Sequence, residues 1–123
     1  MPENNTDIDL TFLYEIADGS DEFIVESISM FLDQSPQIMQ EIDTAIKTQD
    51  WATASAAAHK IKANLGFFGM LNSQAIIQEI ENTCKAGNPD PAQVAANFNE
   101  VNGIINSSLT ELEKIKAEKE ANL

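Results

Sequence analysis

The chain has 123 residues, of which 43% are hydrophobic and 22% charged, a composition that fits one globular domain rather than a disordered or membrane-spanning chain. Its 20 acidic residues and seven lysines give a formal net charge of −13, which argues against nucleic acid and anionic membranes as partners because both require basic surfaces. With one cysteine and one histidine it lacks the ligands for a structural zinc site and has no disulfide partner for Cys84, which fits a reducing, cytoplasmic compartment. We expect a monomer, with Cys84 on the core side of its helix.

The apolar residues recur with helical spacing throughout the chain and predict an all-α domain. Residues 1–6 are polar and are expected to fray, and the natural-looking Met1 favours a free-standing protein over a domain of a larger kinase. A short helix is expected over residues 8–17, ending at residues 18–20, with four side chains available for packing: Leu10, Leu13, Tyr14 and Ile16.

A long helix is expected from Asp21 to about Thr48. Pro36 lies inside it and predicts either a kink or a division after Ser35, because proline lacks an N–H donor and clashes with the preceding turn. The apolar positions of this helix recur every three or four residues, at Ile24, Ile28, Phe31, Ser35, Ile38, Ile42 and Ala45.

Two further helices are expected over residues 51–68 and 72–86, with Asp50 and Asn72 as their N-caps. Asp90 and Pro91 begin a last helix that runs to about residue 116, and residues 117–123 are expected to fray. Four amphipathic helices joined by short loops predict an antiparallel up-down-up-down four-helix bundle, with the short first helix across one end. We expect residues 1–123 to form a single domain.

His59, the only histidine, lies on the helix over residues 51–68 but outside its apolar stripe. Small residues and lysine surround it, so nothing hides the imidazole or keeps another protein away. Gly66 costs about 1 kcal/mol relative to alanine inside a helix, and packing within the domain does not obviously explain it. We expect another protein to dock on this face, on a surface formed by Ser55, Ala56, Lys60, Ala63, Gly66 and Gln78.

The chemistry that suits this face is phosphoryl transfer onto the imidazole. Neutral imidazole is a good nucleophile near pH 7, and no acidic residue occurs between Asp50 and Glu79 to repel an anion. Lys62 lies one helical turn from His59, so its ammonium is expected to stabilise the negative charge of a phosphoryl group there.

A residue of the next helix is expected to orient the imidazole. The turn between the two helices centres near residue 70, and reflection of residue 59 through that point gives residue 81. Glu81 is therefore the candidate to accept a hydrogen bond from His59 and fix its tautomer. Gln78 and Lys85, one turn on either side, are the alternatives.

The run from His59 through Lys62 to Ala63, followed by Gly66 and Gly69, resembles the signature of histidine-containing phosphotransfer (HPt) domains. The resemblance extends over nearly the whole chain. It implies a phosphorelay intermediate that accepts a phosphoryl group on His59 from a receiver-domain aspartate and passes it to another receiver domain. The partners that it implies are response-regulator receiver domains or a hybrid sensor kinase.

The same resemblance implies a phosphocarrier without a cofactor or ATP site, any Mg²⁺ belonging to the partner, and the sequence has no glycine-rich phosphate loop. The acid at position 81 is similar to that of the histidine-bearing domains of chemotaxis kinases, whereas other HPt domains have glutamine there. Asn64 departs from the family, which often has serine or alanine at this position.

The alternative function is a non-catalytic helical adaptor that binds receiver domains, and the presence of both His59 and Lys62 counts against it. A metal or haem bundle would need inward-facing histidine pairs, and a hydrolase would need a nucleophile and base around the single histidine; neither set is present. Trp51 and Phe68 are expected in the core. Phe67 lies off the apolar stripe and either covers the bundle end or joins the docking surface.

Overall fold

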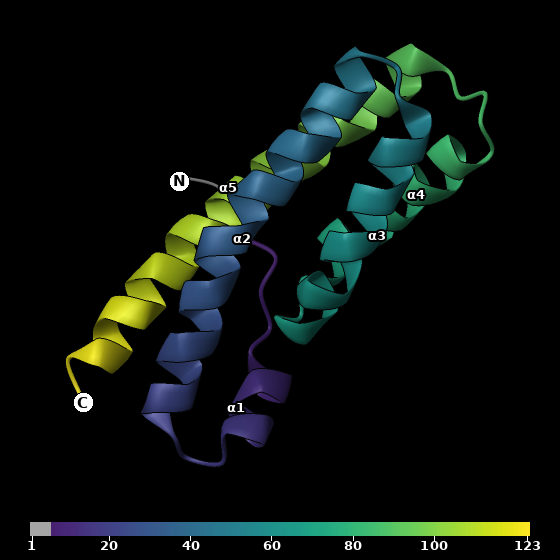
Figure 1. The fold of residues 1–123 in the computed structure, drawn as a ribbon. Helices are drawn as coiled ribbons and strands as arrows, with labels where there is room; N and C mark the ends of the chain where they lie inside the picture. Colours follow the sequence, from purple (N-terminus) through teal and green to yellow (C-terminus); the bar gives the residue numbers. More distant parts are fainter. Residues whose placement is uncertain (1–5) are drawn as a thin grey trace, which may run out of the picture.

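The computed structural model describes residues 6–123, and within that range it contains five helices and no strand. The long helices α2 to α5 form an antiparallel bundle in which α2 and α4 each contact both α3 and α5, while α1 lies at one end (Figure 1). The predicted all-α four-helix bundle with a short additional N-terminal helix is confirmed. The helices are α1 (Thr11–Ala17), α2 (Asp21–Lys47), α3 (Trp51–Phe67), α4 (Leu71–Lys85) and α5 (Pro91–Glu120).

The four bundle helices form one long pair and one short pair. α2 and α5 have 27 and 30 residues, whereas α3 and α4 have 17 and 15. At 1.5 Å per residue the long helices exceed the short ones by roughly 15–20 Å. α1 and the segment before it occupy the end that the α3–α4 hairpin leaves free (Figure 1). Within residues 6–123, every helix is too short or too polar to span a lipid bilayer.

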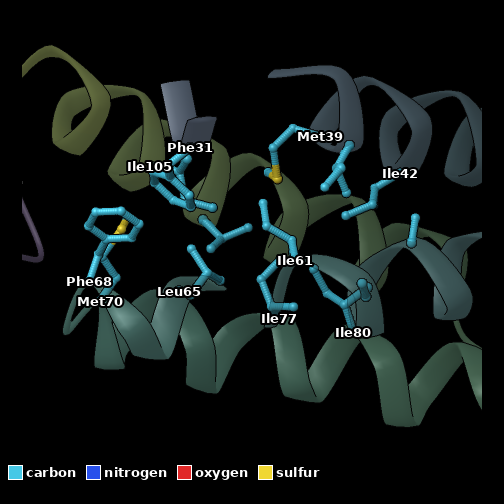
Figure 2. Packing of buried hydrophobic residues seen from close by; sticks show 14 of the residues in the cluster. Phe31, Met39, Ile42, Ile61, Leu65, Phe68, Met70, Ile77, Ile80 and Ile105 are labelled. Atoms are coloured by element: carbon cyan, nitrogen blue, oxygen red, sulfur yellow. The ribbon is translucent and has the colours of Figure 1, made fainter. Parts of the chain in front are cut away.

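The stripes of apolar residues predicted from the sequence form the core. All seven stripe positions of α2 are buried, including Ser35. Figure 2 shows interior side chains of three helices packed together: Met39 and Ile42 from α2, Ile61 and Leu65 from α3, and Ile77 and Ile80 from α4. Burial of each such side chain contributes roughly 1.5–3 kcal/mol, so the core determines which face of α3 points outward.

α2 is continuous through Pro36, so the alternative that the helix divides after Ser35 is wrong. Figure 1 shows α2 changing direction about half-way along its length, as expected where proline removes one backbone donor and crowds the preceding turn. The buried side chains on both sides of Pro36, Ser35 and Ile38 among them, hold the two halves against the same core.

Side chains cap the N-termini of three helices, at Ser20, Asp50 and Asp90. Asp50 accepts a hydrogen bond from the backbone N–H of Thr53 at 3.3 Å, and Asp90 accepts one from that of Ala92 at 3.1 Å, as the sequence predicts. The expected cap at Asn72 is wrong, because α4 begins at Leu71 and its N-cap position is therefore Met70.

The α4 N-terminus is capped from the other end of the sequence. An Asp7 carboxylate oxygen lies 2.6 Å from the backbone nitrogen of Ser73 and accepts its hydrogen bond. The backbone N–H of Asp7 donates to Ser108 Oγ on α5 at 2.9 Å. The chain before α1 is therefore tied to α4 and α5.

α1 begins at Thr11, three residues later than predicted from Ile8. The preceding residues make tertiary contacts instead: the backbone N–H of Asp9 donates to the Phe68 carbonyl at 3.2 Å. Tyr14 and Ile16, expected to pack, are 43% and 46% exposed, so that expectation is wrong. The side chains of this region that do reach the core are Leu10, Leu13 and Ala17.

α5 continues to Glu120, so the fraying expected from residue 117 does not begin there. Lys119 Nζ lies 3.4 Å from Asp21 Oδ1 at the start of α2 and 5.2 Å from the centre of the Tyr14 ring. These contacts join the last turns of α5 to α1 and α2. Of residues 1–6, also expected to fray, residues 1–5 lie outside the described part of the chain.

Candidate functional site

His59 lies on the outward face of α3. Its side chain is 70% exposed, whereas Ala58 and Ile61 on the core face of the same helix are fully buried. Ala56 and Ala63, a turn before and after it, are also exposed. The imidazole is therefore accessible to a macromolecule, as predicted.

Glu81 of α4 lies directly beside His59. Its Oε2 is 2.9 Å from Nδ1 of the imidazole, and its side chain is only 10% exposed. The hairpin geometry thus brings together the two residues that reflection through the turn had paired. Ser55 ties the same helices, because its hydroxyl donates to the Glu81 carbonyl at 3.2 Å.

Lys62 is joined to Glu81 and lies largely inside the α3–α4 interface. Its Nζ lies 2.7 Å from Glu81 Oε1 and 2.8 Å from Gln78 Oε1, and its side chain is 23% exposed. The sequence placed Lys62 near the phosphoryl group and did not indicate this ion pair. Gln78, expected on the docking surface, orients Lys62 and also donates to Asn82 at 2.9 Å.

The environment of Glu81 favours its ionised form. The hydrogen bond from Lys62 is the largest influence and holds the pKa of the carboxyl below its usual 4.5, with the hydrogen bond to His59 acting in the same direction and burial opposing both. An ionised carboxylate only accepts hydrogen bonds, so the proton of a neutral His59 ring is assigned to Nδ1. The lone pair of the ring is then on Nε2.

Packing inside the domain accounts for Gly66, contrary to the expectation from sequence. A Cβ at this position would lie 2.7 Å from Nε2 of Gln74, whose amide crosses the helix there and donates to the Lys62 carbonyl at 3.1 Å. The glycine makes room for a hydrogen bond between α3 and α4. Sequence reasoning missed Gln74 because the spacing of residues does not show how a side chain folds over its neighbour.

Gly69 belongs to the turn rather than to the surface beside His59. Its φ of +67° is a left-handed conformation that favours glycine, and a Cβ would collide with the carbonyl oxygen of Asp9. The segment before α1 therefore closes directly over the α3–α4 turn.

The other residues expected to dock a partner differ in their exposure and in their contacts within the domain. Lys60 is exposed and pairs with Glu41 of α2 at 3.0 Å. Ala56 and Ala63 are exposed, and Ser55 is partly buried. Phe67 packs at the bundle end between Phe12 and Phe68, with ring centres 5.7 Å and 5.2 Å away.

The expectations for the core aromatic residues and the cysteine hold in most respects. Phe68 is buried, whereas Trp51 is only partly buried against the core. Cys84 is buried, and desolvation raises the pKa of its thiol. A buried thiol with a raised pKa is a packing residue rather than a nucleophile.

Comparison with known proteins identifies the family. The sequence model of the Hpt domain matches residues 26–118, so the chain belongs to the Hpt domain family. Members of this family are phosphotransfer modules of two-component signalling that carry phosphoryl groups between kinases and receiver domains. No curated protein sequence matches the chain.

The fold agrees with this assignment. The chain is similar to the crystal structure of the HPT domain from the Hpt sensor hybrid histidine kinase from Shewanella, with a TM-score of 0.78 and 20% sequence identity. The match covers 94% of this chain and 97% of that one. At this identity the likeness establishes the shared fold.

Proposed function

We propose that the protein is a phosphorelay intermediate that accepts a phosphoryl group on Nε2 of His59 from a receiver-domain aspartate and passes it to another receiver domain. The observation that carries the proposal is the hydrogen bond between Nδ1 of His59 and Glu81. It directs the nucleophilic nitrogen of a 70% exposed ring away from the bundle. The monomeric domain presents this nitrogen to each partner in turn.

In the forward step the Nε2 lone pair attacks phosphorus of the aspartyl phosphate, and the P–O bond to the aspartyl group breaks. The aspartate leaves as a carboxylate with the bonding electrons. The imidazole keeps its proton on Nδ1 and becomes positively charged, which the ionised Glu81 stabilises across 2.9 Å. Return transfer to a second receiver reverses these steps.

The receiver supplies the Mg²⁺ in this proposal, and no ATP takes part. The contribution of this chain is to hold the imidazole so that the receiver's phosphoryl group approaches in line, which is the main requirement of phosphoryl transfer. Lys62 keeps Glu81 ionised and so helps to hold the imidazole in place. The exposed Ala56 and Ala63 allow the receiver backbone to come close.

His59→Gln tests the proposal. Wild-type and variant protein are incubated with receiver domains phosphorylated on aspartate, and transferred phosphate is measured together with its acid lability. The wild type is expected to acquire acid-labile phosphate and the variant none. Circular dichroism should stay the same, and the free energy of unfolding should change by at most about 1 kcal/mol, because the side chain is 70% exposed and only its hydrogen bond to Glu81 is affected. A wild type that binds receivers without accepting phosphate is an adaptor, and labelling of the variant would place the acceptor elsewhere.

A further inference from the structure

A shallow depression lies beside the imidazole of His59, between the first half of α3 and the second half of α4. Three of its lining residues are short side chains of α3, and the remaining three are His59 and two charged residues of α4. They are Ala52, Ser55, Ala56, His59, Glu81 and Lys85. Because the α3 wall is made of short side chains, the space next to the ring is open to a phosphoryl group.

The lysines near His59 differ in what holds them. Lys62 is bound to Glu81 and Gln78, and Lys60 is paired with Glu41. Lys85 is exposed, and its ammonium has no hydrogen-bond or ion-pair partner among residues 6–123. Lys85 therefore lines the depression with an ammonium group that forms no ion pair with any residue of the range 6–123.

The charges at the site leave one negative charge of the phosphoryl group without a compensating cation. A phosphoryl group on Nε2 carries about two negative charges, and the imidazolium offsets one of them. Glu81 and Lys62 cancel each other at 2.7 Å. Lys85 follows Glu81 by one helical turn on the same face of α4 and lines the same depression as His59, and its flexible four-carbon side chain is long enough to extend toward the ring.

We propose that the ammonium of Lys85 binds the oxygens of the phosphoryl group on His59, while Lys62 acts on Glu81 as a positioning residue. This inference rests on the proposed function, because it needs the phosphoryl group on Nε2. Lys85 stabilises the negative oxygens during transfer and in the phosphohistidine that follows.

The experiment uses phosphoramidate, a small donor that has no protein surface to dock. It delivers its phosphoryl group to Nε2 as the P–N bond to ammonia breaks, so the rate of phosphohistidine formation reports on the reacting group alone. Lys85→Ala is expected to slow this reaction roughly tenfold, and Lys85→Arg to restore it to within about threefold of wild type. Lys114→Ala, an exposed lysine of α5 with the same loss of charge, is the matched control and is expected to react like wild type.

A second readout is the ³¹P NMR signal of the phosphohistidine, which is expected to shift in Lys85→Ala and not in Lys114→Ala. Equal rates for the two variants would overturn the inference. So would a defect confined to transfer from a phosphorylated receiver, because Lys85 would then contact the partner protein and not the phosphoryl group. A wild type that accepts phosphate from neither donor would instead refute the proposed function, and this inference with it.

Discussion

The ammonium of Lys62 and the carboxylate of Glu81 lie 2.7 Å apart across the interface of α3 and α4, with side chains only 23% and 10% exposed. The cation expected to face a phosphoryl group is thus joined to the acid that orients the histidine. Loss of either side chain leaves the other as a largely buried charge without its counterpart. Because Glu81 also binds His59, the position of the imidazole then changes as well. The two residues act as one unit.

This coupling is measurable by a double-mutant cycle. Lys62→Met is expected to lower the free energy of unfolding by about 2 kcal/mol in the natural chain and by less than about half of that in the Glu81→Gln background. Urea unfolding of the four proteins gives the coupling energy. Lys60→Met is the control, since its exposed ion pair with Glu41 contributes at most about 1 kcal/mol. Additive effects at positions 62 and 81 would contradict the coupling.

The stability that ionised Glu81 contributes is expected to depend on pH in a defined direction. Its pKa in the folded protein lies below the usual 4.5, so at low pH the unfolded chain binds a proton more readily than the folded chain. The contribution is fully present above about pH 5 and declines as the pH falls through 4.5 toward the lower folded value. The difference in unfolding free energy between wild type and Glu81→Gln, measured from pH 3 to 7, should shrink on acidification. A difference that grows instead would show a raised pKa.

Two glycines inside helices allow the gain in helix propensity on a change to alanine to be measured with and without a steric contact. Gly103→Ala on α5 meets nothing within 4 Å and is expected to stabilise the protein by about 1 kcal/mol. Gly66→Ala makes the same gain but displaces the Gln74 amide and its hydrogen bond to Lys62, so its net effect is expected to be smaller, within about 1 kcal/mol of zero. Equal stabilisation by both changes, measured by urea unfolding, would show that Gln74 moves without cost.

Asp7 tests the long-range cap of α4. Asp7→Ala removes the acceptor of the Ser73 N–H and is expected to lower the free energy of unfolding by about 1 kcal/mol. Phosphorylation of His59 by phosphoramidate is expected to continue at the wild-type rate. Asp33→Ala, an exposed acid on α2 with the same change of charge, should leave stability nearly unchanged. Equal stability of the two variants would mean that water replaces the cap.

Local signals in the sequence account for most of the bundle. The stripe on α2 marks its buried face because apolar side chains three and four residues apart share one side of a helix. Asp50 and Asp90 mark helix starts because short polar side chains satisfy free backbone N–H groups. The apposition of His59 and Glu81 follows from the position of one turn, since antiparallel helices of equal rise pair residues symmetrically about it.

The features that sequence reasoning missed depend on residues far apart in the chain. Asp7 and Ser73 are separated by 66 positions, and no periodic pattern encodes such a pairing. Gln74 over Gly66 and Lys62 on Glu81 depend on side-chain conformations that form only after α3 and α4 pack. Tyr14 and Ile16 were expected to pack with the other large side chains of the first helix, but α1 is too short to bury more than one narrow face.

The single, exposed histidine has a practical consequence for experiments on this protein. Every imidazole resonance in its NMR spectrum arises from one ring, so none needs assignment. The ¹⁵N chemical shifts of that ring distinguish its tautomer, its protonated form and its phosphorylated form, and no substitution in the protein is needed to measure them. The effect of each added partner can therefore be followed directly in the signal of the ring nitrogen that gains and loses the phosphoryl group.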